Sequence, residues 1–197
     1  MSNIAYDLGF AKVGQDVTIW PDAKIVGADR VSVGDAVIID DFVFMMSGPV
    51  TTLGSFVHIA SFALITGGGE FEMQDFSGLS GGVRVYTGNE DYSGRALTNP
   101  TVPAPFRVPT RSFVRIERHA IVGANAVILP GVVIGEGAVV GANSLVHKDC
   151  RPWTVYFGSP ARSIKKRPSE RIRELEAALR DVCYDKSGRY VPKARRR

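Results

Sequence analysis

Between Ile116 and Cys150 the chain reads IERHAIVGANAVILPGVVIGEGAVVGANSLVHKDC, and an aliphatic residue returns at every sixth position. The aliphatic positions are Ile116, Val122, Ile128, Ile134, Val140 and Val146. Four residues after each of them stands a residue that is small in nearly every case: Ala120, Ala126, Val132, Ala138, Ser144 and Cys150. One bulky and one small inward position in each unit of six is typical of a parallel β-helix, in which three units make one coil of a triangular prism.

The first half of the chain carries the same pattern with a longer period of twenty residues. Its three aliphatic series are Val13, Val33, Leu53 and Met73, then Ile19, Ile39, Ile59 and Leu79, then Ile25, Met45, Ile65 and Val85. The small inward position is lost on the third side, which has Asp29, Pro49, Gly69 and Asn89. We therefore expect two extra residues at this corner, in coils that stack at the strand spacing of about 4.8 Å.

Two segments outside the repeat are expected to modify the prism. Residues 1–12 precede the first unit and are predicted to cap its open end. Residues 91–115 contain four prolines and no six-residue register, which predicts a long loop that protrudes from the prism. Ser77 falls at an inward position and is expected to be structural.

The C-terminal part of the chain is predicted to be helical. Residues 169–183 begin with Ser169 as a candidate N-cap. One apolar stripe, expected to pack on the last coil or on a neighbouring subunit, is formed by Ile172, Leu175, Leu179 and Val182. We expect the chain to fray from Tyr184 onward. The predicted organisation is an all-β domain over residues 1–167, followed by a C-terminal helix and basic tail over 168–197.

The composition indicates one soluble folded unit. The chain has 197 residues, 45% of them hydrophobic, and no apolar run long enough to span a membrane. Its start lacks the layout of a signal peptide, and two cysteines make no disulfide framework, so we expect a cytoplasmic protein. The net charge of +4 comes largely from a tail containing Lys193, Arg195, Arg196 and Arg197. Without interleaved aromatic residues this tail does not predict nucleic-acid binding.

Two sets of motifs resemble a known family. The quoted stretch and the following YFGSPAR are similar to the coenzyme A-binding half of the hexapeptide-repeat acyltransferases, which include galactoside acetyltransferase and the serine acetyltransferases. The motifs LGFAKVG, IDDF, VHIA, GGGE, DFSGLS, DYSG and LTNPTVP resemble the single-domain branch that acylates sugars, notably amino groups of nucleotide-linked 4-amino-4,6-dideoxysugars. The resemblance implies a left-handed β-helix, acyl-CoA as co-substrate, and a homotrimer with active sites between subunits.

The function expected from this resemblance is transfer of an acyl group, such as acetyl, from acyl-CoA to the amino group of a nucleotide-linked amino-deoxysugar, in O-antigen or capsule biosynthesis. One alternative is an O-acetyltransferase that acts on a sugar hydroxyl, and another is a non-catalytic β-helix scaffold. The related γ-type carbonic anhydrases need three metal-binding histidines. The three histidines of this chain lie far apart in sequence, so no metal is expected.

Acyl transfer needs a general base, and a histidine is the side chain best matched to pH 7. His58 lies at an outward corner in a segment similar to the HIAH stretch of UDP-N-acetylglucosamine acyltransferases, although Ser61 replaces the second histidine there. His119 is expected to point into solvent. Glu90 and Asp91 stand where galactoside acetyltransferase has its catalytic histidine. They are alternative candidates as the base, as acceptor contacts, or as groups that orient His58 across a subunit boundary.

The expected contacts to the two substrates follow from the resemblance. Ala124 and Ala142 match positions whose backbone follows the pantetheine arm. Cationic side chains near the coenzyme phosphates are His147, Lys148, Arg162 and Lys165. The candidate acceptor contacts are Ser80, Tyr86, Tyr92 and Asn99.

Overall fold

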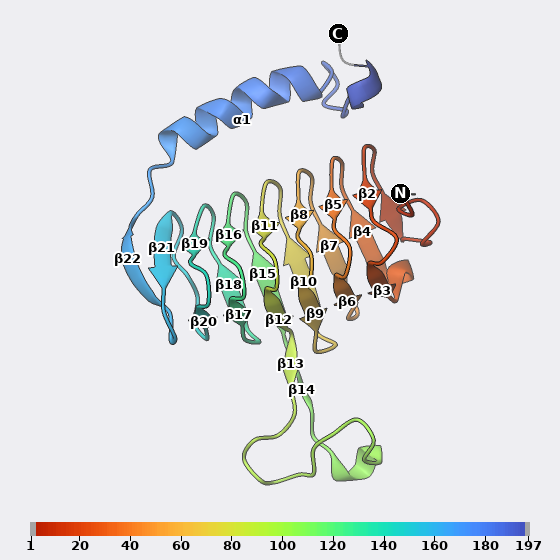
Figure 1. The fold of residues 1–197 in the computed structure, drawn as a ribbon, viewed down its shortest axis with the longest axis vertical. Coiled ribbons are helices and arrows are strands. Elements are labelled where there is room, and N and C mark those ends of the chain that lie inside the picture. The colour runs from red at the N-terminus through yellow and green to blue at the C-terminus, as the bar shows by residue number, and fades with distance from the viewer. Residues whose placement is uncertain (1–2, 196–197) are drawn as a thin grey trace.

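The computed structural model describes residues 3–195 and has the form of a three-sided parallel β-helix (Figure 1). Sheet A contains β1 (Lys12–Val13), β4 (Val31–Val33), β7 (Thr51–Leu53), β10 (Glu70–Met73), β15 (Phe113–Ile116) and β18 (Val132–Ile134). Sheet B contains β2 (Thr18–Ile19), β5 (Ile38–Ile39), β8 (His58–Ile59), β11 (Gly78–Leu79), β16 (Ile121–Val122), β19 (Val139–Val140), β21 (Thr154–Phe157) and β22 (Arg162–Lys166). Sheet C contains β3 (Lys24–Val26), β6 (Phe44–Met46), β9 (Leu64–Thr66), β12 (Arg84–Tyr86), β17 (Val127–Ile128) and β20 (Leu145–Val146).

The predicted aliphatic series form the core of this prism. Met73 is paired with Ile116, so the series with a period of twenty continues directly into the series with a period of six. The same junction occurs on the other two sides. Most inward side chains from these series are almost fully buried in one cluster. The parallel β-helix predicted from the sequence is therefore confirmed. We call its three corners the A–B, B–C and C–A edges.

The C–A edge differs from the other two, as the sequence predicted. Its first turn contains a 3-10 helix at Ala28–Arg30. At a later coil the chain leaves this edge as an antiparallel ribbon of β13 (Gly88–Asn89) and β14 (Thr110–Arg111), which carries the protruding loop in Figure 1. The loop ends earlier than predicted, because residues 113–115 already pair within sheet A as part of β15.

A ladder of stacked rings lies along the A–B edge. The ring centroids of Phe56 and Phe76 are 4.7 Å apart, and those of Phe76 and His119 are 5.0 Å apart. Trp153 follows at 6.1 Å from His119, across Gly137, where a side chain would collide with the indole. The expectation that His119 points into solvent is wrong. This residue is only 7% exposed, because rings and the C-terminal helix cover it.

The C-terminal helix α1 (Glu170–Cys183) runs back along this ladder instead of stopping at the last coil (Figure 1). Its inward contacts are polar. Glu176 pairs with Arg118 and with His119, and Arg180 pairs with Asp75. The predicted apolar stripe therefore does not pack on the prism of its own chain, and two of its members, Leu175 and Val182, are exposed. Its other predicted place, against a neighbouring subunit, stays a prediction.

Both ends of the described chain contact the body of the prism. Ala5 is buried, and the Asn3 side chain bonds the backbone of Val17 and Ile19, so this segment covers the first coil. After α1 the chain does not fray as expected. Tyr190 donates a hydrogen bond to Asp16, and the Lys193 amide bonds the same carboxylate.

Two of the tail residues that we expected to carry charge, Arg196 and Arg197, lie outside the described residues. Within residues 3–195, no helix has the length and apolarity needed to cross a membrane.

Candidate active site

His58 forms a side-chain hydrogen bond with an aspartate of its own chain. It starts β8 with its side chain outward, and its Nε2 lies 3.0 Å from Oδ2 of Asp40 in the preceding coil. The imidazole is 54% exposed and the Asp40 side chain 28%, so the pair is open on one side. A carboxylate bonded to one ring nitrogen orients the imidazole and leaves the other nitrogen available for proton transfer.

Asp40 is a candidate functional residue that the sequence reasoning did not identify. We had expected a carboxylate from a neighbouring subunit in this position. The signal was present in the twenty-residue repeat, because Ile38 pairs with His58 and Asp40 follows at the end of that strand. Residues of adjacent coils on the same side of the prism are therefore the partners that the repeat indicates for His58.

The coil after His58 presents small residues on the same side. Gly78 pairs directly with His58, and Ser80 follows at the B–C edge, half-buried. Ser77 is 2% exposed and donates a hydrogen bond to the Gln74 carbonyl, which confirms its expected inward, structural position. Ser80 is therefore the serine of this segment that a substrate can reach.

The two alanines expected to follow the pantetheine arm continue along the B–C edge. The Ala124 carbonyl accepts a hydrogen bond from the amide of Asn143, which places Ala124 and Ala142 in adjacent coils. The Asn125 amide bonds the Gly81 carbonyl in the same way one coil earlier. His58, Ser80 and the two alanines thus lie near one edge of the prism, on successive coils.

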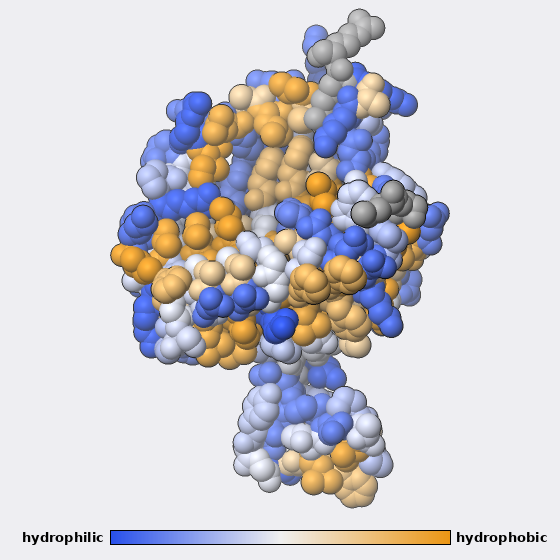
Figure 2. Space-filling model, in the orientation of Figure 1, coloured by the Kyte–Doolittle hydropathy of each residue, from blue (hydrophilic) through white to orange (hydrophobic). Residues whose placement is uncertain are grey.

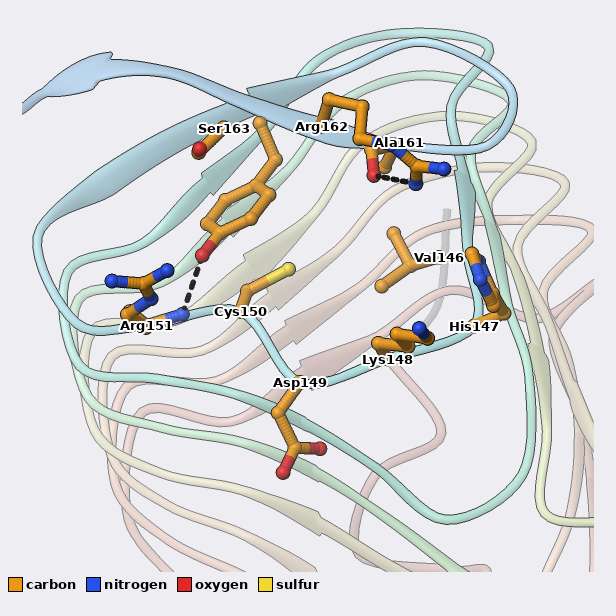
Figure 3. Close-up of a pocket in the computed structure, with 10 residues that line it drawn as sticks. Val146, His147, Lys148, Asp149, Cys150, Arg151, Ala161, Arg162 and Ser163 are labelled. Carbon is orange, nitrogen blue, oxygen red and sulfur yellow. Dashed lines mark hydrogen bonds between the residues drawn. The ribbon is translucent and has the colours of Figure 1, made fainter.

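Three of the predicted phosphate contacts meet in a pocket at the end of the prism (Figure 3). His147, Lys148 and Arg162 line it between the end of β20 and the start of β22. Lys165 lies farther along β22, opposite Val155, and does not line the pocket. His147, Lys148 and Asp149 form the turn between β20 of sheet C and Cys150, which bridges to Ile134 of sheet A, so these side chains lie at the C–A edge of the last coil. The pocket lining combines the basic side chains with one carboxylate, that of Asp149.

Cys150 also lines this pocket, and Figure 3 shows its sulfur directed into the space. Burial, and next the charge of Asp149, raise the pKa of the Cys150 thiol to about 12. A thiol with this pKa stays protonated at neutral pH and is a poor nucleophile. Cys150 is therefore not a candidate nucleophile for covalent catalysis.

The two candidate catalytic carboxylates of the loop, Glu90 and Asp91, both contact other residues of the loop. Glu90 forms an ion pair of 2.7 Å with Arg107 at the loop base. Asp91 accepts hydrogen bonds from Ser93 and from the amides of Arg95 and Ala96. The hydroxyl and amide of Ser93 are the main causes that lower the pKa of Asp91 to about 2. Asp91 is therefore an anion that holds the loop together, and in this conformation it is a weak proton acceptor.

The remaining acceptor candidates are spread over the loop and its base. Tyr86 ends β12 in sheet C, Tyr92 is 86% exposed in the loop, and Asn99 accepts hydrogen bonds from Thr101. The loop leaves the prism at the C–A edge, whereas His58 lies on sheet B. One chain therefore does not bring the loop candidates and His58 together. Among residues 3–195, no group of three or more His, Cys, Asp or Glu side chains could hold a metal ion.

The chain is similar to known proteins in sequence and in structure. The family model for the bacterial transferase hexapeptide, with six repeats, matches residues 113–148. The chain is 37% identical over 175 residues to the dTDP-4-amino-4,6-dideoxy-D-glucose acyltransferase of Escherichia coli, which covers 88% of this chain and 91% of that protein. The chain belongs to the hexapeptide-repeat family of bacterial transferases. The six-residue pattern and the stacked coils of this transferase are the features that define that family's fold.

Among the solved structures similar to this hexapeptide-repeat transferase are complexes with coenzyme A or an acyl-CoA and with dTDP or a dTDP-linked sugar. AntD, an N-acyltransferase from Bacillus cereus, in complex with dTDP and 3-hydroxybutyryl-CoA, is 40% identical with a TM-score of 0.82, covering 88% of this chain and 91% of AntD. A variant of AntD was solved with dTDP-4-amino-4,6-dideoxyglucose and coenzyme A. A putative lipopolysaccharide biosynthesis O-acetyl transferase of Escherichia coli K12 is 33% identical, over 67% of this chain and 58% of that protein.

Proposed function

We propose that this protein transfers an acyl group from acyl-CoA to the amino group of a nucleotide-linked 4-amino-4,6-dideoxysugar. The observation that carries the proposal is the similarity to AntD along almost the whole chain, since AntD structures hold coenzyme A together with a dTDP-linked amino sugar. The chemistry needs a base, a place for the coenzyme and a place for the sugar. The B–C edge offers candidates for all three.

His58 is the proposed general base. The amine nitrogen attacks the thioester carbonyl, His58 takes the proton that the nitrogen loses, and the coenzyme leaves as its thiolate. Asp40 orients the imidazole and stabilises the imidazolium formed in this step. The alternative base is Glu90 or Asp91 from a neighbouring chain. The low pKa of Asp91 fits it better for binding the ammonium form of the acceptor.

The coenzyme is proposed to lie along the B–C edge. Its pantetheine arm passes Ala124 and Ala142, where short side chains let the ligand approach the backbone. Its phosphates extend across the end of the prism to Arg162, Lys148 and His147 in the pocket, with Lys165 contributing from β22. Charge-assisted hydrogen bonds to phosphate are roughly twice as strong as neutral ones, so this end supplies much of the binding.

The acceptor is proposed to lie between subunits of a homotrimer. Ser80 contacts it from the coil of one chain, and Tyr86, Tyr92 and Asn99 contact it from the base and loop of another. We further propose that the catalytic domain spans residues 1–167, with 168–197 as a C-terminal extension, and that the protein works in the cytoplasm in surface-polysaccharide synthesis. Two buried free cysteines support a reducing compartment.

The test measures turnover of dTDP-4-amino-4,6-dideoxyglucose with acetyl-CoA and with 3-hydroxybutyryl-CoA. Release of the free thiol of coenzyme A is the signal. His58→Asn should lower kcat by about 10²–10⁴-fold, the range for loss of a general base. Thr18→Asn, in the same outward row two coils away, is the matched control and should keep wild-type turnover. A folded His58→Asn enzyme with more than about a tenth of wild-type kcat would remove His58 from this role.

A sugar hydroxyl is the second candidate acceptor, because one similar relative is a putative O-acetyl transferase. The two acceptors are separated by offering the amino sugar and the matching 4-hydroxy sugar at equal concentration. Acylation of the hydroxy sugar alone would replace the amine proposal.

A further inference from the structure

One glycine interrupts a row of side chains beside His58. The outward row of sheet B is fixed by the strand register, and its members after Thr18 are Ile38, His58, Gly78, Ile121, Val139 and Val155. Every member except Gly78 carries a side chain. Since neighbouring strands lie about 4.8 Å apart, the backbones of His58 and Ile121 are roughly 10 Å apart, and the missing side chain leaves a notch between their side chains.

The fold gives no reason for glycine at this position. The φ angle of Gly78 lies outside the left-handed region, and an added Cβ would meet only the His58 carbonyl oxygen, at 3.7 Å, an ordinary contact. Gly123 is different, because a Cβ there would lie 2.6 Å from the Ala142 amide nitrogen. A β-branched or aromatic residue suits a strand better than glycine does. The space above Gly78 is thus kept open without benefit to the backbone.

The walls of the notch differ in chemistry. On one side stands the imidazole of His58, held by Asp40. On the other side stands Ile121, which is 40% exposed. Ser80 lies two residues beyond Gly78 at the edge. A six-membered sugar ring has polar edges and an apolar C–H face, and a deoxy position adds a methyl group, so its two sides match these two walls.

Building on the proposed function, we propose that Gly78 is a specificity-determining residue and that the notch above it receives the sugar ring of the acceptor. The ring lies against the Gly78 backbone, with its amino group toward His58 and its apolar face toward Ile121. An acyl chain fits this place less well, because the notch is open to solvent and one wall is formed by the polar side chains of His58 and Asp40.

The test is to fill the notch. Gly78→Ala and Gly78→Val should fold with an unchanged or slightly higher Tm, because the backbone accepts a side chain. The KM for the amino sugar should rise by about tenfold in Gly78→Ala and further in Gly78→Val, since a methyl group in a fitted site changes specificity by this order. The KM for acyl-CoA should stay the same. Val139→Ile, which enlarges a side chain in the same row two coils away, is the control and should behave as wild type.

A second readout is the affinity for dTDP-4-amino-4,6-dideoxyglucose measured by calorimetry without coenzyme, which should fall in the same order. An active Gly78→Val enzyme with an unchanged KM for the amino sugar would overturn the proposal. A rise in the KM for acyl-CoA that depends on acyl length would also overturn it, by placing the acyl group in the notch. Wild-type protein without any turnover would instead refute the proposed function, and the assignment of Gly78 with it.

Discussion

The three histidines of this chain have the same side chain in three different environments. His58 is open to solvent and paired with Asp40, His147 lines a cationic pocket, and His119 is buried in an aromatic ladder. Burial, and next the charge of Arg118, lower the pKa of His119. The nearby Glu176 does not reverse this, because its carboxylate is shared with Arg118 and Arg180. His119 is therefore neutral in the folded protein and serves to hold α1.

We predict that this neutral histidine makes stability depend on pH. Its contribution is complete above the ordinary pKa of about 6.5 and is lost as the pH falls from there through the lowered value, since the unfolded chain then binds the proton more readily. Wild-type Tm should therefore fall by a few degrees between about pH 7.5 and pH 5.5. His119→Phe should remove that part of the fall, because phenylalanine does not titrate. The backbone should accept it, because Phe76 already has the same left-handed conformation one coil earlier. Equal slopes for both proteins would contradict the prediction.

At the scale of elements, one five-residue turn occurs twice. The sequences DYSGR at 91–95 and DKSGR at 185–189 form the same arrangement, in which the aspartate accepts the hydroxyl and amide of the serine and the amide of the arginine. Each glycine has a left-handed φ, and the pKa of each aspartate is lowered to about 2. Because the second copy lies outside the proposed site, the turn forms without any substrate.

We predict that Asp91→Asn loosens the protruding loop while the prism keeps its Tm. The asparagine amide would replace one oxygen with a donor that faces the amides of Arg95 and Ala96. Limited trypsin digestion should then cut after Arg95 several times faster than in wild type. Asp185→Asn is the matched control, which should speed cutting after Arg189 and leave the loop unchanged. Unchanged cutting after Arg95 in Asp91→Asn would contradict this account.

On the scale of the whole molecule, two exposed apolar surfaces lie apart from each other. Phe42 and Phe62 stack at the B–C edge with centroids 5.2 Å apart, and they are 55% and 62% exposed. Figure 2 shows hydrophobic residues gathered at the tip of the protruding loop, where exposed members include Leu97, Phe106 and Val108. Phe56 is covered by Tyr184 and Tyr190 of its own chain.

We predict a homotrimer whose active sites combine the B–C edge of one chain with the loop of the next. Sedimentation should give three chains per particle at micromolar concentration, and Phe42→Glu with Phe62→Glu should weaken assembly. Coexpression of His58→Asn with a variant lacking residues 90–109 should restore about a quarter of the sites in mixed trimers, because each site takes one part from each chain. A stable wild-type monomer, or no restoration, would contradict a shared site.

The sequence by itself determined the prism, because the code for a β-helix is local: one inward aliphatic residue every six positions leads each coil to bury its neighbour's face. It also indicated candidate donor residues between 124 and 165, of which His147, Lys148 and Arg162 line one pocket. It did not determine what covers the A–B edge. The apolar stripe of α1 predicted an apolar packing face, but the edge presents Arg118, His119 and Asp75, so the helix turns its charged side inward.

Contacts between distant residues were decided only by the tertiary structure. Asp40 reaches His58 diagonally, because stacking pairs Ile38, two residues before Asp40, with His58. Tyr190 reaches Asp16 across 174 residues because α1 spans the length of the prism. The role proposed for Gly78 depends on its neighbours His58 and Ile121, which the strand register places on either side of it. Periodicity specifies which way a side chain points, whereas its partners depend on how the coils, the helix and the loop are finally arranged in space.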